Sequence, residues 1–192
     1  TALEIMEHDD NTVTPEMRRI AKAINFGIIY GMGPRKLSEE VGIDQKTAKS
    51  YIEAYFKRYQ GVARYREEVI REAREKGYVK TLFGRRRYLP DILQENGMAR
   101  AEAERMAINT PIQGTAADLI KKAMINIHRR FRERKFKSRM LLQVHDELVF
   151  ETPEEETEAV IEAIKEEMEH VHSLRVPLEV EIGKGKNWDE AH

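Results

Sequence analysis

The stretch that most constrains the fold of this chain is TPEMRRIAKAINFGIIYG, residues 14–31. Thr14 is a good N-cap and Pro15 suits the first helical position, where no backbone donor is needed, so a helix is predicted to begin here. At helical pitch, one face collects Met17, Ile20, Ala21, Ile24 and Ile28. Another face repeats every fourth residue and carries Arg18, Lys22, Phe26 and Tyr30. The helix therefore combines a core face with a face of two cations followed by two aromatic rings.

The cation and aromatic face has two interpretations. Cations near the helix N-terminus with rings further along suit an elongated ligand that has a polyanionic end and a flat end, such as a nucleoside triphosphate. The alternative is an ordinary amphipathic helix whose cations are solvated and whose rings belong to the core. Gly27 costs about 1 kcal/mol relative to alanine inside a helix, which indicates close packing against the backbone there. Gly31 and Gly33, followed by Pro34, indicate the helix end.

Composition sets the class of protein. A chain of 192 residues with 41% apolar content can form one large domain or two small ones. No apolar run reaches the length of a membrane span, and the first residues lack the pattern of a signal peptide, so a soluble protein of the cytoplasm is expected, with no membrane partner. The chain has no cysteine, which excludes disulfides and thiolate metal sites within it, and its six histidines form no convincing metal pair.

Charge is distributed unevenly although the net charge is only −1. Residues 121–139 contain nine Lys or Arg and one acid, whereas residues 151–169 contain nine Glu and one base. A basic face that attracts phosphate and an acidic face that repels it would result. The alternative for each run is a solvated helix face, which we prefer for the acidic one.

Capping residues and glycine stops predict the remaining elements. Residues 1–8 resemble a helix already under way, without an initiating methionine or a cap, which suggests a cut start. Helices are then predicted over 34–41, from the Asp44 cap to about residue 59 with Gly61 ending it, and over 62–76. A short strand is predicted over 78–82, a helix over 98–109 that breaks at Thr110-Pro111, and a helix over 115–135. A hairpin over 139–151, a helix after Pro153 and a strand over 177–182 complete a small sheet layered with helices.

Two polar groups follow the central helix along the chain. Arg85, Arg86 and Arg87 come directly after Phe83-Gly84 and are expected in a turn, where they can form a phosphate clamp or a solvated basic turn. Further on, the side chains four apart are Arg105, Asn109 and Gln113. Such a stripe can test the minor groove of a duplex without strong sequence preference, although ordinary helix polarity would give the same spacing.

A third polar group is His145-Asp146-Glu147, between two apolar runs of RMLLQVHDELVFE. The pattern indicates a buried β-hairpin with two adjacent carboxylates at its turn. Polar turn residues are common, so a structural turn is the alternative. Mg²⁺ is commonly held by one or two carboxylates plus substrate phosphates, which this turn provides in part.

Several segments together resemble one family. RRIAKAINFGIIYG resembles the nucleotide-binding helix of family A DNA polymerases, the bacterial DNA polymerase I type, and QVHDELVFE resembles their catalytic hairpin. TLFGRRRYLP, ERMAINTPIQGTAADLIKKAM and NWDEAH fit the same family in the same order, so that the resemblance covers practically the whole chain. It favours the functional interpretation of the central helix, the Asn/Gln stripe and the acidic turn.

The resemblance implies a role for each group. Arg18 and Lys22 would bind the triphosphate of a deoxynucleotide (dNTP), with Lys22 also a candidate proton donor to pyrophosphate. Phe26 would pack on the sugar and base, and Tyr30 would fill the templating position until the helix closes. Three sets of residues would contact the primer–template DNA. The minor groove would be contacted by Arg105, Asn109 and Gln113, the primer end by His145, and the DNA also by Arg85, Arg86 and Arg87. Asp146 would be a ligand in a two-Mg²⁺ site, with Glu147 in a supporting role.

One departure from the family concerns that metal site. The family's other metal-binding aspartate lies in a strand motif resembling DYSQIELR, upstream of the central helix, and nothing like it occurs here. The thumb and exonuclease regions are absent too. We therefore expect the C-terminal piece of a longer or split polymerase, inactive alone, and a partner chain that supplies the missing aspartate. The lost strand should pair beside the hairpin, leaving an exposed sheet edge and apolar surface in this chain.

These observations predict an α+β protein with a fingers-like helical region over 1–96 and the C-terminal half of a palm-like region over 97–192. The predicted function is template-directed DNA synthesis in the bacterial nucleoid or a phage-infected host, with Lys22 and Asp146 facing one cleft. A rival is a noncatalytic primer–template or nucleotide-binding subunit. A second rival is an acidic helical scaffold, which requires the absence of salt-dependent DNA binding.

Overall fold

The structure is a computed structural model that describes residues 14–191. The helix expected over residues 1–8 lies outside this range. The chain divides into two compact units after Ile112, and each unit is described by itself. The boundary falls inside a long helix, whereas the sequence placed the change of region at residue 96. The assignment of 1–96 and 97–192 to a fingers-like and a palm-like region stays a prediction. None of the described helices is long and apolar enough to cross a bilayer.

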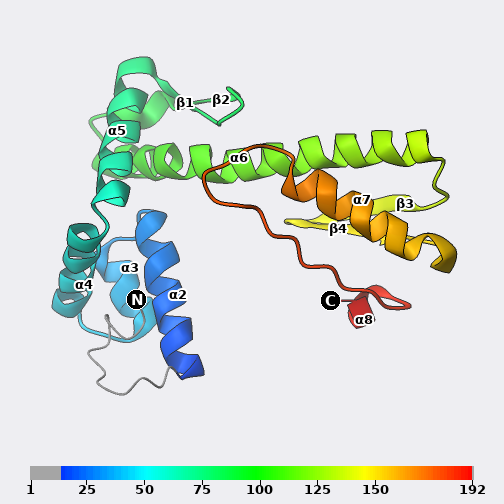
Figure 1. Ribbon diagram of the computed structural model, residues 1–192. Helices are drawn as coiled ribbons and strands as arrows, with labels where there is room; N and C mark the ends of the chain where they lie inside the picture. The colour runs from blue at the N-terminus through cyan, green and yellow to red at the C-terminus, as the bar shows by residue number, and fades with distance from the viewer. Residues whose placement is uncertain (1–13, 192) are drawn as a thin grey trace. The chain divides into compact units, whose positions relative to one another are not determined.

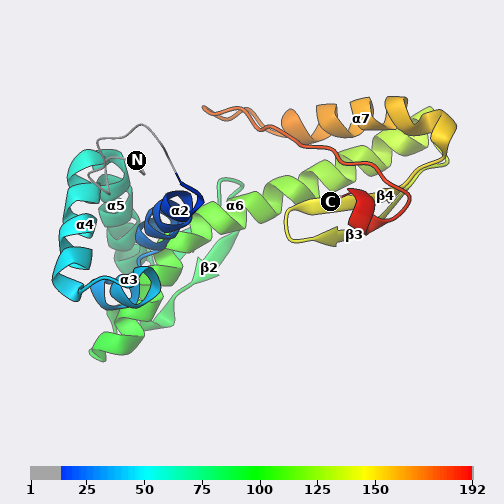
Figure 2. The same ribbon diagram turned by 90° about the horizontal axis from the view of Figure 1, so that it is seen from below.

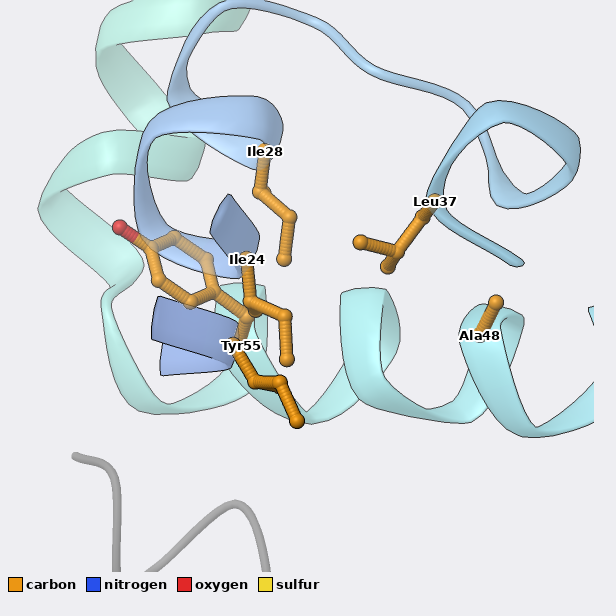
Figure 3. Packing of buried hydrophobic residues seen from close by; sticks show 6 residues of the cluster. Ile24, Ile28, Leu37, Ala48 and Tyr55 are labelled. Carbon is orange, nitrogen blue, oxygen red and sulfur yellow. The ribbon is translucent and has the colours of Figure 1, made fainter. Parts of the chain in front are cut away.

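Helices α2, α3 and α4 of the first unit enclose its first core (Figures 1 and 2). Their bounds are Pro15–Ile29, Pro34–Val41 and Gln45–Arg58. Figure 3 shows Ile24 and Ile28 of α2 beside Leu37 of α3 and Ala48 and Tyr55 of α4, all of them buried. The apolar face predicted for the central helix is confirmed, because Met17, Ile20 and Ala21 are buried as well.

Both ends of α2 form as their residues predict. The Thr14 side chain accepts a hydrogen bond from the Met17 amide at 3.1 Å, which caps the helix start. At the other end, the Met32 amide donates to Gly27 O and the Gly31 amide to Ile28 O, the pattern of a Schellman motif. Gly31 has φ +81°, a conformation that favours glycine. The close packing expected at Gly27 comes from Met32, because a Cβ at Gly27 would lie 2.8 Å from Met32 Cε.

A second core lies between α5 (Gln60–Lys76), the hairpin of β1 (Tyr78–Lys80) and β2 (Arg86–Tyr88), η1 (Pro90–Leu93) and the start of α6 (Gly97–Arg134). Its buried residues are Ala73, Val79, Leu89, Ile92, Ala103 and Ala107. One boundary prediction is wrong, because Gly61 lies inside α5 and does not separate the helices. The break is at Tyr59, whose backbone leaves the helical region (φ −105°, ψ 63°) while its ring packs on Tyr55 at 4.7 Å.

Helix α6 contradicts the predicted break at Thr110-Pro111, because it runs unbroken with Pro111 in its interior. Proline removes one helical hydrogen bond and costs about 3 kcal/mol, so other contacts must offset it. Two side chains supply donors to the preceding turn. The Thr110 hydroxyl donates to Met106 O at 2.6 Å and the Tyr65 hydroxyl to Ile108 O at 2.9 Å. Both bonds go to the carbonyls on either side of Ala107, the residue whose helical donor Pro111 lacks, so they add contacts around the proline without replacing the lost bond.

The second unit packs a hairpin against two helices. Strands β3 (Arg139–Val144) and β4 (Glu147–Glu151) pair antiparallel, and α7 (Thr157–Glu169) follows the short η2 (Glu154–Glu156). Ile127 and Phe131 of α6 contact Val160 and Ile164 of α7 in a core that Met140, Leu148 and Phe150 of the hairpin complete. Figure 1 shows the hairpin beside α7. The expected α+β class is confirmed.

Two predictions for the second unit are wrong. Residues 177–182 form no strand, and the hairpin is a two-stranded sheet. The segment instead returns along α7, where the Val180 amide donates to Glu169 Oε1 at 3.1 Å and Lys184 Nζ donates to Glu158 Oε1 at 3.0 Å. An alternating segment becomes a strand only when it pairs with another strand, and residues 177–182 do not pair with the hairpin. The chain then ends in α8 (Trp188–Ala191).

The hairpin is also less buried than its apolar runs predicted. Leu141 is 55% exposed and Leu142 is 45% exposed, because only the other face of the hairpin packs on the helices. A register shift between Met140 and Leu142 interrupts the pairing here. Exposed leucines next to an open edge agree with the expectation that this chain presents apolar surface on its sheet.

Candidate functional site

Helix α2 presents the predicted cation and aromatic face to solvent. Arg18 and Lys22 are exposed, and among residues 14–191 neither forms an ion pair. Phe26 is 48% exposed and its ring stacks on Tyr30, with 6.1 Å between centroids and 15° between planes. Phe26 therefore does not belong to the core, whereas Tyr30 is half-buried. Two exposed cations in line with a stacked ring pair, of which Phe26 is exposed, can bind a polyanion that carries a flat group.

The C-terminal end of α2 lies on α6 within the first unit. Asn109 Nδ2 donates a long hydrogen bond of 3.5 Å to Tyr30 O. A Cβ on Gly31 would lie 3.2 Å from Arg105 Cγ and 3.8 Å from Ile108 Cδ1. The structure thus brings Tyr30 of the cation and aromatic face together with Arg105 and Asn109, which are predicted to contact the DNA duplex. Gln113, the third member of that stripe, is exposed and belongs to the second unit.

Arg105 and Asn109 differ in their surroundings. The Arg105 guanidinium is paired with the Glu102 carboxylate and is otherwise exposed, so it is accessible to a ligand. Asn109 is half-buried, and its Oδ1 is buried without a hydrogen bond from the part of the chain that is described. A buried amide oxygen without a donor costs free energy of about 1–3 kcal/mol. Asn109 therefore contacts α2 through its Nδ2, while its Oδ1 accepts no hydrogen bond from the described residues.

The sequence suggested that Arg85, Arg86 and Arg87 share one turn, and in the structure they do not. Arg86 and Arg87 lie in β2, where neighbouring side chains point to opposite faces. The Arg86 guanidinium lies over the Tyr78 ring at 4.7 Å, whereas Arg87 contacts Thr110 Oγ1 at 3.4 Å and Met106 Sδ at 3.3 Å on α6. Arg85 precedes the strand and its amide donates to Thr81 Oγ1 at 3.2 Å. Pairing in the β1–β2 hairpin separates side chains that are adjacent in sequence.

The acidic turn of the second unit consists of His145 and Asp146, which connect Val144 to its partner Glu147. Both turn residues are exposed, while Glu147 is half-buried as the first residue of β4. His145 has φ 52°, an uncommon conformation for a residue other than glycine, and its carbonyl accepts from Gln143 Nε2 at 2.9 Å. Asp146 is therefore presented at the tip of a two-residue turn with a strained neighbour, as functional residues often are.

The metal-binding capacity of this turn is limited. Within residues 14–191, no three acidic or histidine side chains come together as a metal site. Mg²⁺ in nucleotide sites often has one or two protein carboxylates and several substrate oxygens. Asp146 fits as one of these ligands with Glu147 beside it, and within residues 14–191 no third acidic or histidine side chain joins them as a metal site.

The sequence did not predict the structural role of several charged residues. Glu156, in the acidic run that we expected to be solvated, accepts hydrogen bonds from the Lys137 amide at 2.9 Å and from the Ser138 amide at 3.1 Å. The Lys137 amide is the main cause of the lowered pKa of Glu156. Arg130 likewise joins α6 to Glu166 and Glu167 of α7. Nothing distinguishes these glutamates from their exposed neighbours in the sequence, because the donors come from distant segments.

Gly31 provides a direct test of the contact between α2 and α6. Gly31→Ala is expected to lower the free energy of unfolding by about 1–2 kcal/mol, because its backbone is left-handed, and by more through the Arg105 contact. Gly42→Ala is the matched control, since Gly42 has φ +76° and its added Cβ would meet nothing within 4 Å. Denaturant unfolding of both variants measures the difference. Equal losses would show that the contact with Arg105 contributes nothing.

Comparisons with known proteins identify relatives of this chain. The family model described as DNA polymerase family A matches residues 1–190. The chain is 51% identical over 191 residues to DNA polymerase I of Bacillus caldotenax, covering 100% of this chain and 22% of that protein. It is 50% identical over 192 residues to DNA polymerase I of Pseudomonas aeruginosa, covering 100% of this chain and 21% of that protein. The chain thus spans about a fifth of the length of these relatives.

A solved structure is similar over nearly the whole chain. It is described as the POL domain of Pol1 from M. smegmatis in complex with DNA primer-template and dNTP. The TM-score is 0.94 at 44% sequence identity, and the match covers 99% of this chain and 34% of that one.

Proposed function

The chain belongs to DNA polymerase family A, and from this premise we propose that it supplies the nucleotide-binding helix and one catalytic carboxylate for template-directed DNA synthesis. The reaction is transfer of a nucleotidyl group from a dNTP to the primer 3′-hydroxyl. The observation that carries the proposal is the face of α2 on which Arg18 and Lys22, exposed and without an ion pair within residues 14–191, precede a stacked ring pair. That face matches a dNTP in both charge order and shape.

Residues of the first unit would bind and align the nucleotide. Arg18 and Lys22 would hold the triphosphate, and the Lys22 ammonium can donate a proton to the departing pyrophosphate. Phe26 would pack on the sugar and base. Tyr30 would occupy the templating position until α2 closes, which makes closure a step of base selection.

Several residues from both units would contact the DNA duplex. Arg105 on α6 is exposed beside the end of α2, Asn109 is half-buried there, and Gln113 is exposed one turn further along the helix. Together they would contact the minor groove, which offers acceptors at every base pair and so permits a test of shape without strong sequence preference. Arg85, Arg86 and Arg87 would contact the backbone phosphates, and His145 the primer end.

Asp146 would be a Mg²⁺ ligand, with Glu147 supporting it from the start of β4. A two-ion site stabilises the attacking and leaving oxygens of phosphoryl transfer when the metal is bound. Since no group of three ligating side chains forms around Asp146 within residues 14–191, we propose that an aspartate outside this chain completes the site. The exposed Leu141 and Leu142 support an additional polymerase segment beside the hairpin. Because the relatives named above are bacterial, we place this protein in the bacterial cytoplasm, at the nucleoid or in a phage-infected host.

Primer extension with and without the N-terminal polymerase segments tests this proposal. The chain alone is expected to be inactive, whereas the chain joined to or mixed with those segments is expected to extend a primer in the presence of Mg²⁺. Extension must stop when the metal is chelated. Failure under every combination would instead favour a noncatalytic subunit that binds primer–template or nucleotide, a function that the single carboxylate also permits. Binding of duplex DNA that weakens with salt would exclude a scaffold without a nucleic-acid role.

A further inference from the structure

The turn of α6 before Pro111 is supported by side chains from two other elements. Pro111 has no amide hydrogen to donate, so this part of the helix lacks one backbone hydrogen bond. From β2, Arg87 contacts Met106 Sδ at 3.3 Å and Thr110 Oγ1 at 3.4 Å. From α5, the Tyr65 hydroxyl donates to the Ile108 carbonyl at 2.9 Å, across 43 residues of sequence.

The same turn of α6 also contacts the C-terminal end of α2. Ile108, whose carbonyl accepts from Tyr65, is 2% exposed, and its Cδ1 lies next to Gly31. Asn109, the next residue, donates to the Tyr30 carbonyl. Tyr65 is therefore connected to the end of α2 through two neighbouring residues of α6, and all of these contacts lie within the first unit.

We propose that Tyr65 is a positioning residue for nucleotide selection, because its hydroxyl holds the turn of α6 that fixes Tyr30 and Gly31 at the end of α2. The inference rests on the proposed function, in which α2 binds the dNTP and Tyr30 stands at the templating position. Tyr65 does not touch the nucleotide in this scheme. It acts through Ile108 and Asn109. These two residues fix the position of the end of α2, and so of Tyr30, while no template base occupies the templating position.

The chemistry of the hydroxyl suits this role. Tyr65 is half-buried, and burial raises its pKa to about 12. The hydroxyl therefore stays protonated and remains a donor at any pH at which a polymerase works. Phenylalanine would keep the ring and remove only this donor, leaving the Ile108 carbonyl without its side-chain partner. The Asn109 hydrogen bond, already long at 3.5 Å, would loosen first.

Hydrogen exchange in the complete polymerase that contains this chain tests the connection. Tyr65→Phe is expected to speed exchange of the Gly31 and Met32 amides about fivefold, the factor that corresponds to loss of one ordinary hydrogen bond. Both amides donate within the α2 end, so they report its stability. Tyr51→Phe is the matched control, since Tyr51 is a half-buried tyrosine of α4 that packs against the first core. Equal exchange in the two variants would overturn the proposal.

Nucleotide selection provides a readout that a purely structural role would not change. For Tyr65→Phe, the KM for the correct dNTP is expected to rise about fivefold with kcat within twofold, and discrimination against an incorrect dNTP is expected to fall. Combining Tyr65→Phe with Asn109→Ala should add less than the product of the single effects, because the two residues act in series. Unchanged discrimination, or a strictly multiplicative double variant, would contradict a role in selection.

The two hypotheses fail in distinguishable ways. If the complete wild-type polymerase does not extend a primer, the proposed function fails, and the role in nucleotide selection falls with it. If the wild type extends but Tyr65→Phe matches Tyr51→Phe in exchange and in selection, only the role of Tyr65 is wrong.

Discussion

Asp146→Ala is expected to abolish primer extension by the complete polymerase, lowering kcat by about a thousandfold or more. A thousandfold corresponds to ~4 kcal/mol of transition-state stabilisation, a reasonable loss when a metal site loses a carboxylate ligand. Nucleotide binding and duplex binding should survive, because Asp146 lies at the exposed tip of the hairpin and contributes nothing to the apolar core of the second unit.

The measurement is single-turnover extension at saturating dNTP, with binding of dNTP and of primer–template followed separately. Asp146→Asn is the conservative variant, since it keeps the shape and removes the charge that Mg²⁺ requires. Glu154→Ala removes an exposed carboxylate from the same unit and should leave the rate unchanged. Retention of more than a tenth of the wild-type rate in Asp146→Asn would exclude Asp146 as a metal ligand.

Lys22→Ala is expected to lower kcat/KM for the dNTP by about a hundredfold while duplex affinity stays nearly unchanged. One charge-assisted hydrogen bond to phosphate is worth about 1.5–3 kcal/mol, which is about 10- to 200-fold at 1.36 kcal/mol per tenfold. The fold should tolerate the change, because Lys22 is exposed on the face of α2 opposite the buried isoleucines.

Steady-state extension over a range of dNTP concentrations separates the two parts of this effect. A higher KM alone would indicate binding of the triphosphate, whereas a lower kcat would indicate a contribution such as proton donation to pyrophosphate. Lys36→Ala, which removes an exposed lysine from α3, is the control for loss of one positive charge from the first unit. Equal losses of duplex binding in the Lys22 and Asp146 variants would contradict both assigned roles.

What the sequence by itself determined lies in local chemistry. A cap at Thr14, a left-handed glycine at position 31 and an apolar repeat place α2, and these depend on residues within one or two turns. The same repeat predicts which side of α2 is exposed, so the cation and ring face was predictable residue by residue. The motifs of the hairpin were recognisable for a similar reason, since a two-residue turn joins strands that are neighbours in sequence.

Only the tertiary structure decided the features that depend on distant partners. Pro111 ought to end a helix, yet α6 continues through it, with hydrogen bonds from Tyr65 and Thr110 to carbonyls of the same turn. Residues 177–182 alternate like a strand, yet they run along α7, where the Val180 amide donates to Glu169 Oε1. Asn109 meets Tyr30 across 79 residues. Helical periodicity sets the face on which a side chain lies, but the free energy of contacts between remote segments determines what that face touches.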